Sequence, residues 1–254
     1  MLFQTESTMD IINDNLRIST MTQITKFHSP INLQNLFELF NISDTISYIE
    51  YADNIPKGEK KKKINKRKKD DTKKRKFFYN QVTIHVVKHK IVNVKIFNNG
   101  GVQMTGLKSK EQGEYVVNIL KNLLQQHGLV PNDVSLSPIK IVLINSDFDF
   151  GQEINREMLH RLIVEENYYS SFEPIIYPGV NIKYYFNTNN RAGICQCGDI
   201  CNGKGQNGNC KKITIAVFKS GKIIITGGQS IQQINTAYNF ITSFLSENKD
   251  LIKI

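Results

Sequence analysis

The fold is decided by the stretch Phe97-Asn-Asn-Gly-Gly-Val-Gln-Met-Thr105-Gly106, because this stretch occurs twice in the chain. It returns without a gap, 121 positions later, as Phe218-Lys-Ser-Gly-Lys-Ile-Ile-Ile-Thr226-Gly227. A repeat of this length is too long for a solenoid unit and has the size of half a domain. The duplication therefore predicts two similar halves that share one fold.

Each copy is predicted to form a β-hairpin. Apolar and polar residues alternate over 92–97 and again over 102–105, which is the pattern of half-buried strands. Asn99-Gly100 between them supplies the positive φ that a tight turn needs. The glycine that closes each copy, Gly106 or Gly227, is expected to end the return strand. The counterparts in the second copy are residues 213–218, the turn Ser220-Gly221 and residues 222–226.

A helix is predicted to follow each hairpin. Ser109-Lys-Glu-Gln112 and Ser230-Ile-Gln-Gln233 fit a capping box, in which the serine accepts from a backbone N–H and the glutamine reaches back. Gly128 and Pro131 are expected to end the first helix, over 109–127. Each helix carries an apolar stripe at helical spacing. The stripes are Val116, Ile119, Leu120, Leu123 and Leu124 in the first copy and Ile234, Ala237, Tyr238, Ile241, Phe244 and Leu245 in the second.

These motifs resemble the TATA-box-binding protein family, whose two repeats each carry a Phe-x-x-Gly-x-x-x-x-Thr-Gly hairpin followed by a long helix. Before the second copy, Glu173-Pro174 and Tyr177-Pro-Gly179 resemble the family's second stirrup. The resemblance covers most of residues 16–248. It implies an α+β saddle, in which two pseudo-symmetric repeats form one curved antiparallel sheet with helices on the convex face. The expected divisions are a flexible N-terminal tail over 1–15, repeat 1 over 16–128 and repeat 2 over 129–254.

The beginning of repeat 1 is less regular. Apolar residues and threonines alternate weakly from Leu16 to Phe27, which predicts a strand. Ser29-Pro30 is then expected to open a helix. The apolar residues of that helix are Ile31, Leu33, Leu36, Phe37 and Phe40.

A lysine-rich insertion, residues 57–76, carries the whole formal charge of the chain. It holds 13 of the 33 basic residues and 3 of the 23 acidic residues, which leaves 20 of each elsewhere. A segment of this composition cannot bury a core and is predicted to be disordered. It would attract phosphate or serve as a nuclear-import-like signal, and the alternative is a solvated loop with no dedicated partner.

The resemblance implies two aromatic pairs that insert into DNA, Tyr79 with Phe97 and Tyr177 with Phe218. Aromatic wedges between base steps unstack and kink the duplex, as they do in the TATA-box-binding protein itself. Both members of each pair are phenylalanine in the family. Here the first is tyrosine, whose hydroxyl needs a hydrogen-bond partner or water. The alternative for all four is ordinary packing on the sheet.

Other family contacts carry over unevenly. The family's central minor-groove asparagines are replaced by Thr20 and Leu143, although Asn145 lies two residues on and on the same strand face. Gly101 replaces a phosphate-contacting lysine. Because the body outside the insertion is neutral, we expect weak intrinsic DNA affinity. The implied minor-groove residues are Thr105, Thr226, Gln103, Ile224 and Asn145, and the implied phosphate contacts are Lys108, Lys183, Lys222 and His85.

All four cysteines lie in a glycine-rich insertion, residues 187–211, which is expected near the second stirrup. Four thiolates could close around a structural Zn²⁺ and order a segment that has no apolar core. The spacing lacks the paired C-x₂-C knuckles of a strong zinc signal, so reduced thiols or disulfides stay open. Disulfides are disfavoured because nothing marks the chain as secreted. The cysteines are Cys195, Cys197, Cys201 and Cys210.

The chain is not expected to be an enzyme, to require a cofactor or to enter a membrane. Its five histidines have no metal or base spacing, and no apolar run approaches the ~18 residues of a membrane span. Asp147-Phe-Asp149 is a carboxylate pair that is expected to follow a strand and to cap or solvate the turn before a helix near Glu153. The alternative is a two-metal site.

The resemblance implies a transcription initiation factor that binds the minor groove of AT-rich double-stranded promoter DNA, bends it and recruits a TFIIB-like factor and RNA polymerase machinery. Glu173 matches a partner-binding glutamate of the stirrup, whereas Ile175 stands where a second glutamate would be. One alternative is an interaction scaffold that has lost specific DNA reading, and another is a substrate-grip appendage of a nucleic-acid enzyme. The frequent Asn, Ile and Lys resemble divergent members from large DNA viruses, which implies work in a nucleus or a cytoplasmic viral replication compartment.

Overall fold

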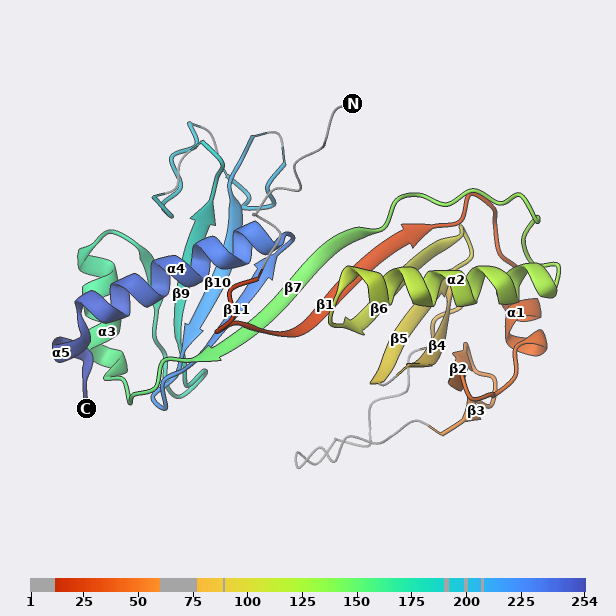
Figure 1. The fold of residues 1–254 in the computed structure, drawn as a ribbon, viewed down its shortest axis with the longest axis horizontal. Helices are drawn as coiled ribbons and strands as arrows, with labels where there is room; N and C mark the ends of the chain where they lie inside the picture. The colour runs from red at the N-terminus through yellow and green to blue at the C-terminus, as the bar shows by residue number, and fades with distance from the viewer. Residues whose placement is uncertain (1–11, 60–76, 89, 190–191, 199–200, 207) are drawn as a thin grey trace. The chain divides into compact units, whose positions relative to one another are not determined.

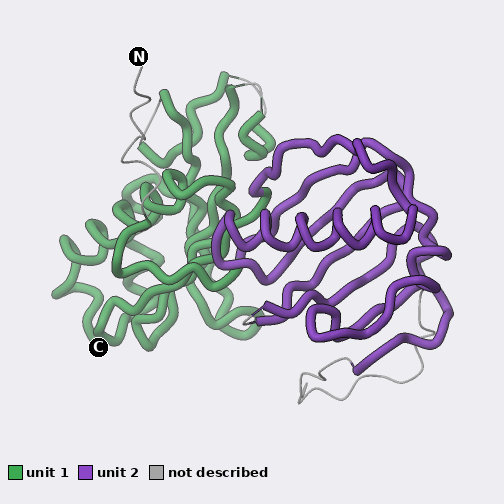
Figure 2. The backbone as a smooth tube through the Cα atoms, turned by 45° about the vertical axis from the view of Figure 1, so that its right-hand side comes forward, with its two compact units in different colours: residues 1–20, 142–254 green, residues 21–141 purple. Residues whose placement is uncertain are grey.

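The computed structural model describes residues 12–59, 77–88, 90–189, 192–198, 201–206 and 208–254. These residues divide into two compact units, one formed by 1–20 with 142–254 and the other by 21–141 (Figure 2). We call them the C-terminal unit and the N-terminal unit. Each unit contains one copy of the duplicated hairpin. The boundary at 20/21 differs from the repeat boundaries because the start of the first strand packs with the second repeat.

The N-terminal unit is an antiparallel sheet with two helices. Its strands lie in the order β3-β2-β4-β5-β6-β1, where β1 contributes its second part. Helix α1 packs on β2 and β4, and α2 packs on β6. The elements are β1 (Arg17–Lys26), α1 (Leu33–Leu39), β2 (Ile46–Tyr51), β3 (Lys57–Gly58), β4 (Gln81–Lys88), β5 (Lys90–Phe97), β6 (Gly101–Leu107) and α2 (Lys110–Gln126).

The C-terminal unit repeats this design. The first part of β1 begins its sheet, and the order continues β7-β11-β10-β9-β8. Helix α4 runs across β9, β10 and β11, and α3 packs on β8 and β9 (Figure 1). The elements are β7 (Lys140–Asp149), α3 (Arg156–Glu165), β8 (Tyr169–Ser171), β9 (Val180–Phe186), β10 (Lys211–Val217), β11 (Lys222–Gly228), α4 (Ile231–Glu247) and α5 (Lys249–Ile252). The predicted α+β class with antiparallel strands is confirmed.

The duplicated hairpins form as the sequence predicts. Strands β5 and β6 pair antiparallel around Gly100 at φ +82°, and β10 and β11 pair around Gly221 at φ +81°. The prediction that Gly106 and Gly227 end the strands is wrong. They take φ values of +101° and +100° one residue before the strands end, beside register shifts against β1 and β7. Both glycines therefore kink the strand rather than stop it.

The helix caps are also confirmed, with one difference. The Ser109 hydroxyl accepts from Gln112 N at 3.4 Å, and the Ser230 hydroxyl accepts from Gln233 N at 3.3 Å. Each glutamine Oε1, however, accepts from the N–H one residue before the serine, at 2.7 Å in both copies. The second predicted apolar stripe is buried in full, whereas Ile119 and Leu123 of the first are only half-buried.

Two expectations for the N-terminal unit need correction. Helix α1 begins after Asn32, whose side chain caps Asn35 N, and not at Ser29-Pro30. Lys57 and Gly58 of the insertion are not disordered but form β3 against β2. The Lys57 ammonium donates to carbonyl oxygens at the end of α1, at 2.7 and 2.9 Å, which fixes this strand to the helix. The prediction for 60–76 lies outside the described residues, as do residues 1–11 of the tail expected over 1–15. In the described part of that tail, Asn13 N donates to the Asn235 side-chain oxygen at 3.1 Å, so this part is held to helix α4.

Each sheet has one face covered by helices and one that we call the open face. In β11, Ile223 and Ile225 are fully buried on the covered face, while Ile224 alternates with them and is 37% exposed. The same alternation holds in β9, where Lys183 and Tyr185 lie between buried residues. The sequence therefore separates residues that build the core from residues available to a partner.

Candidate nucleic-acid interface

The open face of the C-terminal unit centres on β7 and β11. Asn145 lies opposite Thr226, and the Thr226 hydroxyl donates to the Asn145 side-chain oxygen. Because the Asn145 oxygen accepts this bond, the amide nitrogen of Asn145 is the group that can donate to a partner. Asp147 lies opposite Ile224 on the same face, and Asp149 lies opposite Lys222. The predicted minor-groove residues of this unit therefore share one surface with two carboxylates.

An aromatic pair stands at the end of this face. The Tyr177 and Phe218 ring centroids are 5.8 Å apart with the ring planes at 60°. Gly179 fits beside them, since a Cβ there would come within 2.9 Å of Tyr177 and 3.2 Å of Phe218. Tyr177 keeps 37% of its surface exposed. The structure thus brings together the two residues predicted as one intercalating pair.

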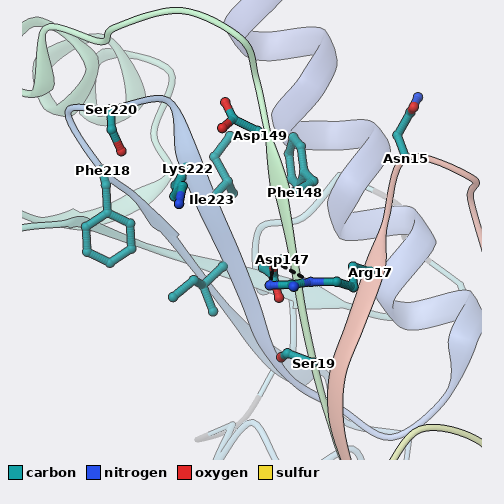
Figure 3. Close-up of a pocket in the computed structure, with 11 residues that line it drawn as sticks. Asn15, Arg17, Ser19, Asp147, Phe148, Asp149, Phe218, Ser220, Lys222 and Ile223 are labelled. Carbon is teal, nitrogen blue, oxygen red and sulfur yellow. Dashed lines mark hydrogen bonds and ion pairs between the residues drawn. The ribbon is translucent and has the colours of Figure 1, made fainter.

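A hollow of about 800 Å³ lies beside Phe218, between the first part of β1 and strands β7 and β11 (Figure 3). The Arg17 guanidinium reaches across it and donates to Asp147 at 2.6 and 3.1 Å. Arg17 is 77% exposed along its side chain and Asp147 27%. This ion pair neutralises one of the two carboxylates on the open face.

The expectation that Asp147-Phe-Asp149 follows a strand is wrong, because all three residues belong to β7. The alternation of Ile144, Ser146 and Phe148 with Asn145 and Asp147 was the signal that could have extended the strand. Asp149 does cap a turn, since its carboxylate accepts from Gly151 N at 2.9 Å. Helix α3 is instead capped by Asn155.

The open face of the N-terminal unit has equivalent positions. Thr22 lies opposite Thr105 with their hydroxyls 3.5 Å apart, and Ile24 lies opposite Gln103. Phe97 is half-buried at the end of β5. Tyr79, two residues before the residue that pairs with Phe97, is 63% exposed. The predicted contacts of this unit also share one surface, with the aromatic residues at its end.

The four predicted phosphate contacts differ in accessibility. Lys183 donates to the Thr214 hydroxyl at 3.0 Å, and its pKa is lowered by burial and by the nearby Lys212 charge. Lys222 is exposed. Lys108 lines a hollow of about 120 Å³ with Lys88 and Lys90. His85 is the least accessible. It is 8% exposed, packs on Tyr48 with ring centroids 4.9 Å apart and has Nε2 3.2 Å from the Asn93 amide.

The second stirrup presents an exposed tip. The backbone oxygen of Glu173 accepts from the N–H groups of Ile176 and Tyr177, both at 2.9 Å, which leaves the side chain outside the turn. Ile175 is 100% exposed and Ile176 84%. This tip combines one carboxylate with two aliphatic side chains.

The four cysteines form a cluster with ligand atoms within 4.8 Å of one another. Burial raises the pKa of the Cys210 thiol to about 12, whereas a backbone hydrogen bond from Gly203 lowers the pKa of Cys201. The expected position near the second stirrup is wrong. The insertion follows the end of β9 at Phe186, whereas the stirrup precedes its start at Val180, so the two lie at opposite ends of the strand.

Comparisons with known proteins agree on one family. Residues 138–248 match the family model described as transcription factor TFIID or TATA-binding protein. The chain is 32% identical over 202 residues to a TATA-box-binding protein-like protein of Acanthamoeba polyphaga mimivirus, covering 70% of this chain and 51% of that protein. It is 29% identical over 161 residues to a TATA-box-binding protein of Methanocaldococcus jannaschii, covering 63% of this chain and 71% of that one. The chain thus spans about half the length of the mimivirus relative.

A solved structure supports the same fold. The chain aligns with the Methanococcus jannaschii TBP at a TM-score of 0.57 and 22% identity, over 92% of this chain and 99% of that one. Among the helices in the described part of the chain, none has the length and apolar character of a membrane span.

Proposed function

We propose that this chain is a divergent TATA-box-binding-protein-like transcription factor that binds and bends promoter DNA. A family model, a viral relative and the fold of a solved structure each support this assignment. The observation that carries this proposal is the open face of the C-terminal unit, with the Tyr177/Phe218 pair at its end. The face offers polar groups at its centre, apolar surface beside them and aromatic rings at its edge. A protein that bends DNA from the minor groove needs this combination of groups.

The centre of the face reads the groove. Bases in AT-rich minor grooves present only acceptor atoms, so a protein needs donors there. Asn145 is held by Thr226 with its amide nitrogen available to donate. Ile224 is 37% exposed next to this pair and offers apolar contact to the sugars and base edges. Such a face distinguishes AT from GC pairs, because the guanine amino group would meet both donor and apolar surface.

The aromatic pairs bend the duplex. Unstacking one base step costs a few kcal/mol, which the contact surface gained by bending offsets. Phe218 is apolar and enters a base step without an unsatisfied polar group. Tyr177 carries a hydroxyl, so its ring serves best at the edge of the step, where water or a phosphate reaches the oxygen.

The charges of the face set the affinity. Asp147 and Asp149 repel phosphates, and the Arg17 ion pair removes part of that repulsion. Residues 57–76 carry a net charge of +10, from 13 basic and 3 acidic residues, and would compensate through counterion release. We therefore expect affinity that falls steeply with salt.

The second stirrup recruits the transcription machinery. Glu173 is exposed outside its turn, and Ile175 and Ile176 extend the surface with aliphatic side chains. A TFIIB-like factor that offers a basic group beside an apolar pocket would fit this tip, and RNA polymerase machinery would follow. The relative from a large DNA virus supports work in a viral replication compartment as well as in a nucleus.

The test is a binding series by fluorescence anisotropy, with the full chain on AT-rich and base-scrambled duplexes over a range of salt. The proposal expects tighter binding to the AT-rich duplex at every salt concentration. Phe218→Ala should weaken that preference, while Phe240→Ala, on the covered side in helix α4, controls for general damage. Equal affinity for both duplexes would contradict DNA reading by this face.

A second candidate function is an interaction scaffold that has lost specific DNA reading. The observation that favours it is the pair Asp147 and Asp149, because carboxylates on the open face oppose a polyanion. If the scaffold is correct, Glu173→Lys will abolish capture of the TFIIB-like factor, whereas Phe218→Ala will leave every measured interaction unchanged.

A further inference from the structure

We propose that the insertion between β9 and β10 binds one structural zinc ion through its four cysteines. The ion fixes the insertion to the ends of both strands and presents a group of lysines beside the open face. The zinc site is inferred from the cysteine cluster alone, whereas the role of the lysines rests on the proposed DNA binding. The ligands are Cys195, Cys197, Cys201 and Cys210.

The sulfur positions fit a single tetrahedral ion. All four Sγ atoms lie within 4.8 Å of one another, and Cys197 Sγ is 3.6 Å from Cys210 Sγ. Four thiolates around one zinc at about 2.3 Å place their sulfurs about 3.8 Å apart. Disulfide sulfurs are bonded at about 2.05 Å, and two disulfides would not bring all four atoms to one point. All four cysteines are free thiols.

The donor set favours zinc over harder ions. Four thiolates in a tetrahedral arrangement suit zinc or iron, whereas magnesium and calcium take oxygen ligands. An iron–sulfur cluster would separate the cysteine sulfurs further, because inorganic sulfide bridges the irons. The Asn187 amide donates to Cys210 Sγ at 3.8 Å and to the Gly208 carbonyl at 3.0 Å. Such an outer hydrogen bond orients a ligating thiolate.

The segment around the cluster has few other sources of stability. Its described residues are mostly polar or glycine, and Cys210 is the one buried hydrophobic residue among those from 195 to 210. Backbone hydrogen bonds join it to the strands, from Lys212 N to Gly203 O at 2.8 Å and from Tyr185 N to Gly193 O at 2.8 Å. A segment of this kind gains its order from the metal.

An insertion ordered by zinc would also hold the lysines near it in fixed positions. Lys204 forms an isolated β-bridge with Lys211, which lies on the covered side of β10 with Ile213 and directly precedes Lys212. Lys212 is exposed and lies on the same face of β10 as Thr214, whose hydroxyl accepts from Lys183 at 3.0 Å. Like charges stay together only where the backbone holds them or where an anion joins them. The zinc site would hold the backbone so that a DNA phosphate can join these lysines.

The metal content of the purified full chain tests the site. We expect about one zinc per chain by elemental analysis, and visible absorption of a tetrahedral thiolate complex after replacement with Co²⁺. Cys197→Ser and Cys210→Ser should lose the metal. Gly198→Ser is the matched control, since it adds the same side chain in the same loop at a position with nothing within 4 Å. Iron in place of zinc, or a wild-type chain that takes up neither zinc nor Co²⁺, would overturn the assignment.

Two readouts separate the site from its role. Chelation of the wild-type chain should speed protease cleavage within 192–210 and leave the helix signal in circular dichroism unchanged, so the result does not depend on a variant that folds. In the same samples, DNA affinity should fall about fivefold, with a salt slope smaller by one to two. Zinc loss without any change in DNA affinity would refute the link to the lysines while the metal site stands. A chain that binds zinc but no DNA would refute the proposed function instead.

Discussion

The open faces of the two units share one design but differ in charge. In each unit, the return strand of the hairpin pairs with the first strand of its repeat. Corresponding residues of the two repeats lie on the open face of their own sheet. The N-terminal unit has one cation in this row, and the C-terminal unit has two carboxylates and one cation. The opposed pairs are Thr22/Thr105, Ile24/Gln103 and Lys26/Gly101 in the N-terminal unit, and Asn145/Thr226, Asp147/Ile224 and Asp149/Lys222 in the C-terminal unit.

The covered faces do not differ in this way. Met104 and Ile225, at equivalent positions of the two hairpins, are both 0% exposed. The fold therefore constrains the covered side of each strand and leaves the open side to function. The open face of the C-terminal unit is therefore expected to repel phosphate more than the open face of the N-terminal unit.

The largest expected effect tests the covered side. Ile225→Ala and Met104→Ala should each lower the free energy of unfolding by about 3 kcal/mol, because both leave a cavity in a packed core. Their open-face neighbours, Ile224→Ala and Gln103→Ala, should change it by no more than about 0.5 kcal/mol. Urea denaturation of the four variants measures this. Equal losses on both sides would mean that the open face is itself part of a core.

The second prediction compares the aromatic pairs. Phe218→Ala should weaken binding to an AT-rich duplex by about 2 kcal/mol, or about 30-fold, since a stacked aromatic is worth 1–3 kcal/mol per base. Phe97→Ala should cost a similar amount in the other unit. Anisotropy titrations at fixed salt provide the measurement. If only one variant loses affinity, DNA contacts are confined to one unit.

The third prediction removes a carboxylate from the open face of the C-terminal unit and adds one at the equivalent position of the N-terminal unit. Asp147→Asn keeps the side-chain shape, releases Arg17 to meet a phosphate and should tighten DNA binding about fivefold. Ile24→Asp, at the equivalent position, should weaken it by a similar factor. The slope of log affinity against log salt should change by about one in opposite directions. Glu247→Gln, an exposed change at the end of α4, is the control and should leave the slope unchanged.

The last prediction concerns the glycine beside the second stirrup. Gly179→Ala places a Cβ within 2.9 Å of Tyr177 and 3.2 Å of Phe218, so a ring must leave its preferred rotamer. The cost of about 1 kcal/mol should reduce the affinity for bent DNA about fivefold. Gly101→Ala should matter less, because its Cβ would stand 3.6 Å from the Phe97 ring, and its nearest neighbour, at 3.0 Å, is the side-chain oxygen of Asn99. Competition with a prebent duplex measures both, and identical results would show that the Tyr177/Phe218 geometry is unimportant.

Local features were predictable because they depend on neighbouring residues. The hairpin turns at Gly100 and Gly221 and the serine caps of α2 and α4 follow from positive φ and free N–H groups within a few residues. The fold class followed from duplication, and the predicted Tyr177/Phe218 contact followed from a family resemblance.

The errors concern long-range arrangement. The Arg17–Asp147 ion pair joins residues 130 positions apart, and no local pattern announces it. The position of the cysteine insertion was missed because the strand between Val180 and Phe186 separates it from the stirrup, and a strand carries the chain to the other end of the sheet. The register of β7, which places both carboxylates on the open face, depended on where a strand ends, and composition alone does not fix that.

The central claim is that the open faces bend duplex DNA, and end-to-end energy transfer on a doubly labelled duplex tests it most directly. The full chain, titrated to saturation on an AT-rich duplex, should raise the transfer efficiency, and the rise should vanish in the Phe97→Ala/Phe218→Ala double variant at concentrations that still saturate the DNA. Saturation by the wild-type chain with no change in transfer would contradict the account, because the duplex would then be bound straight.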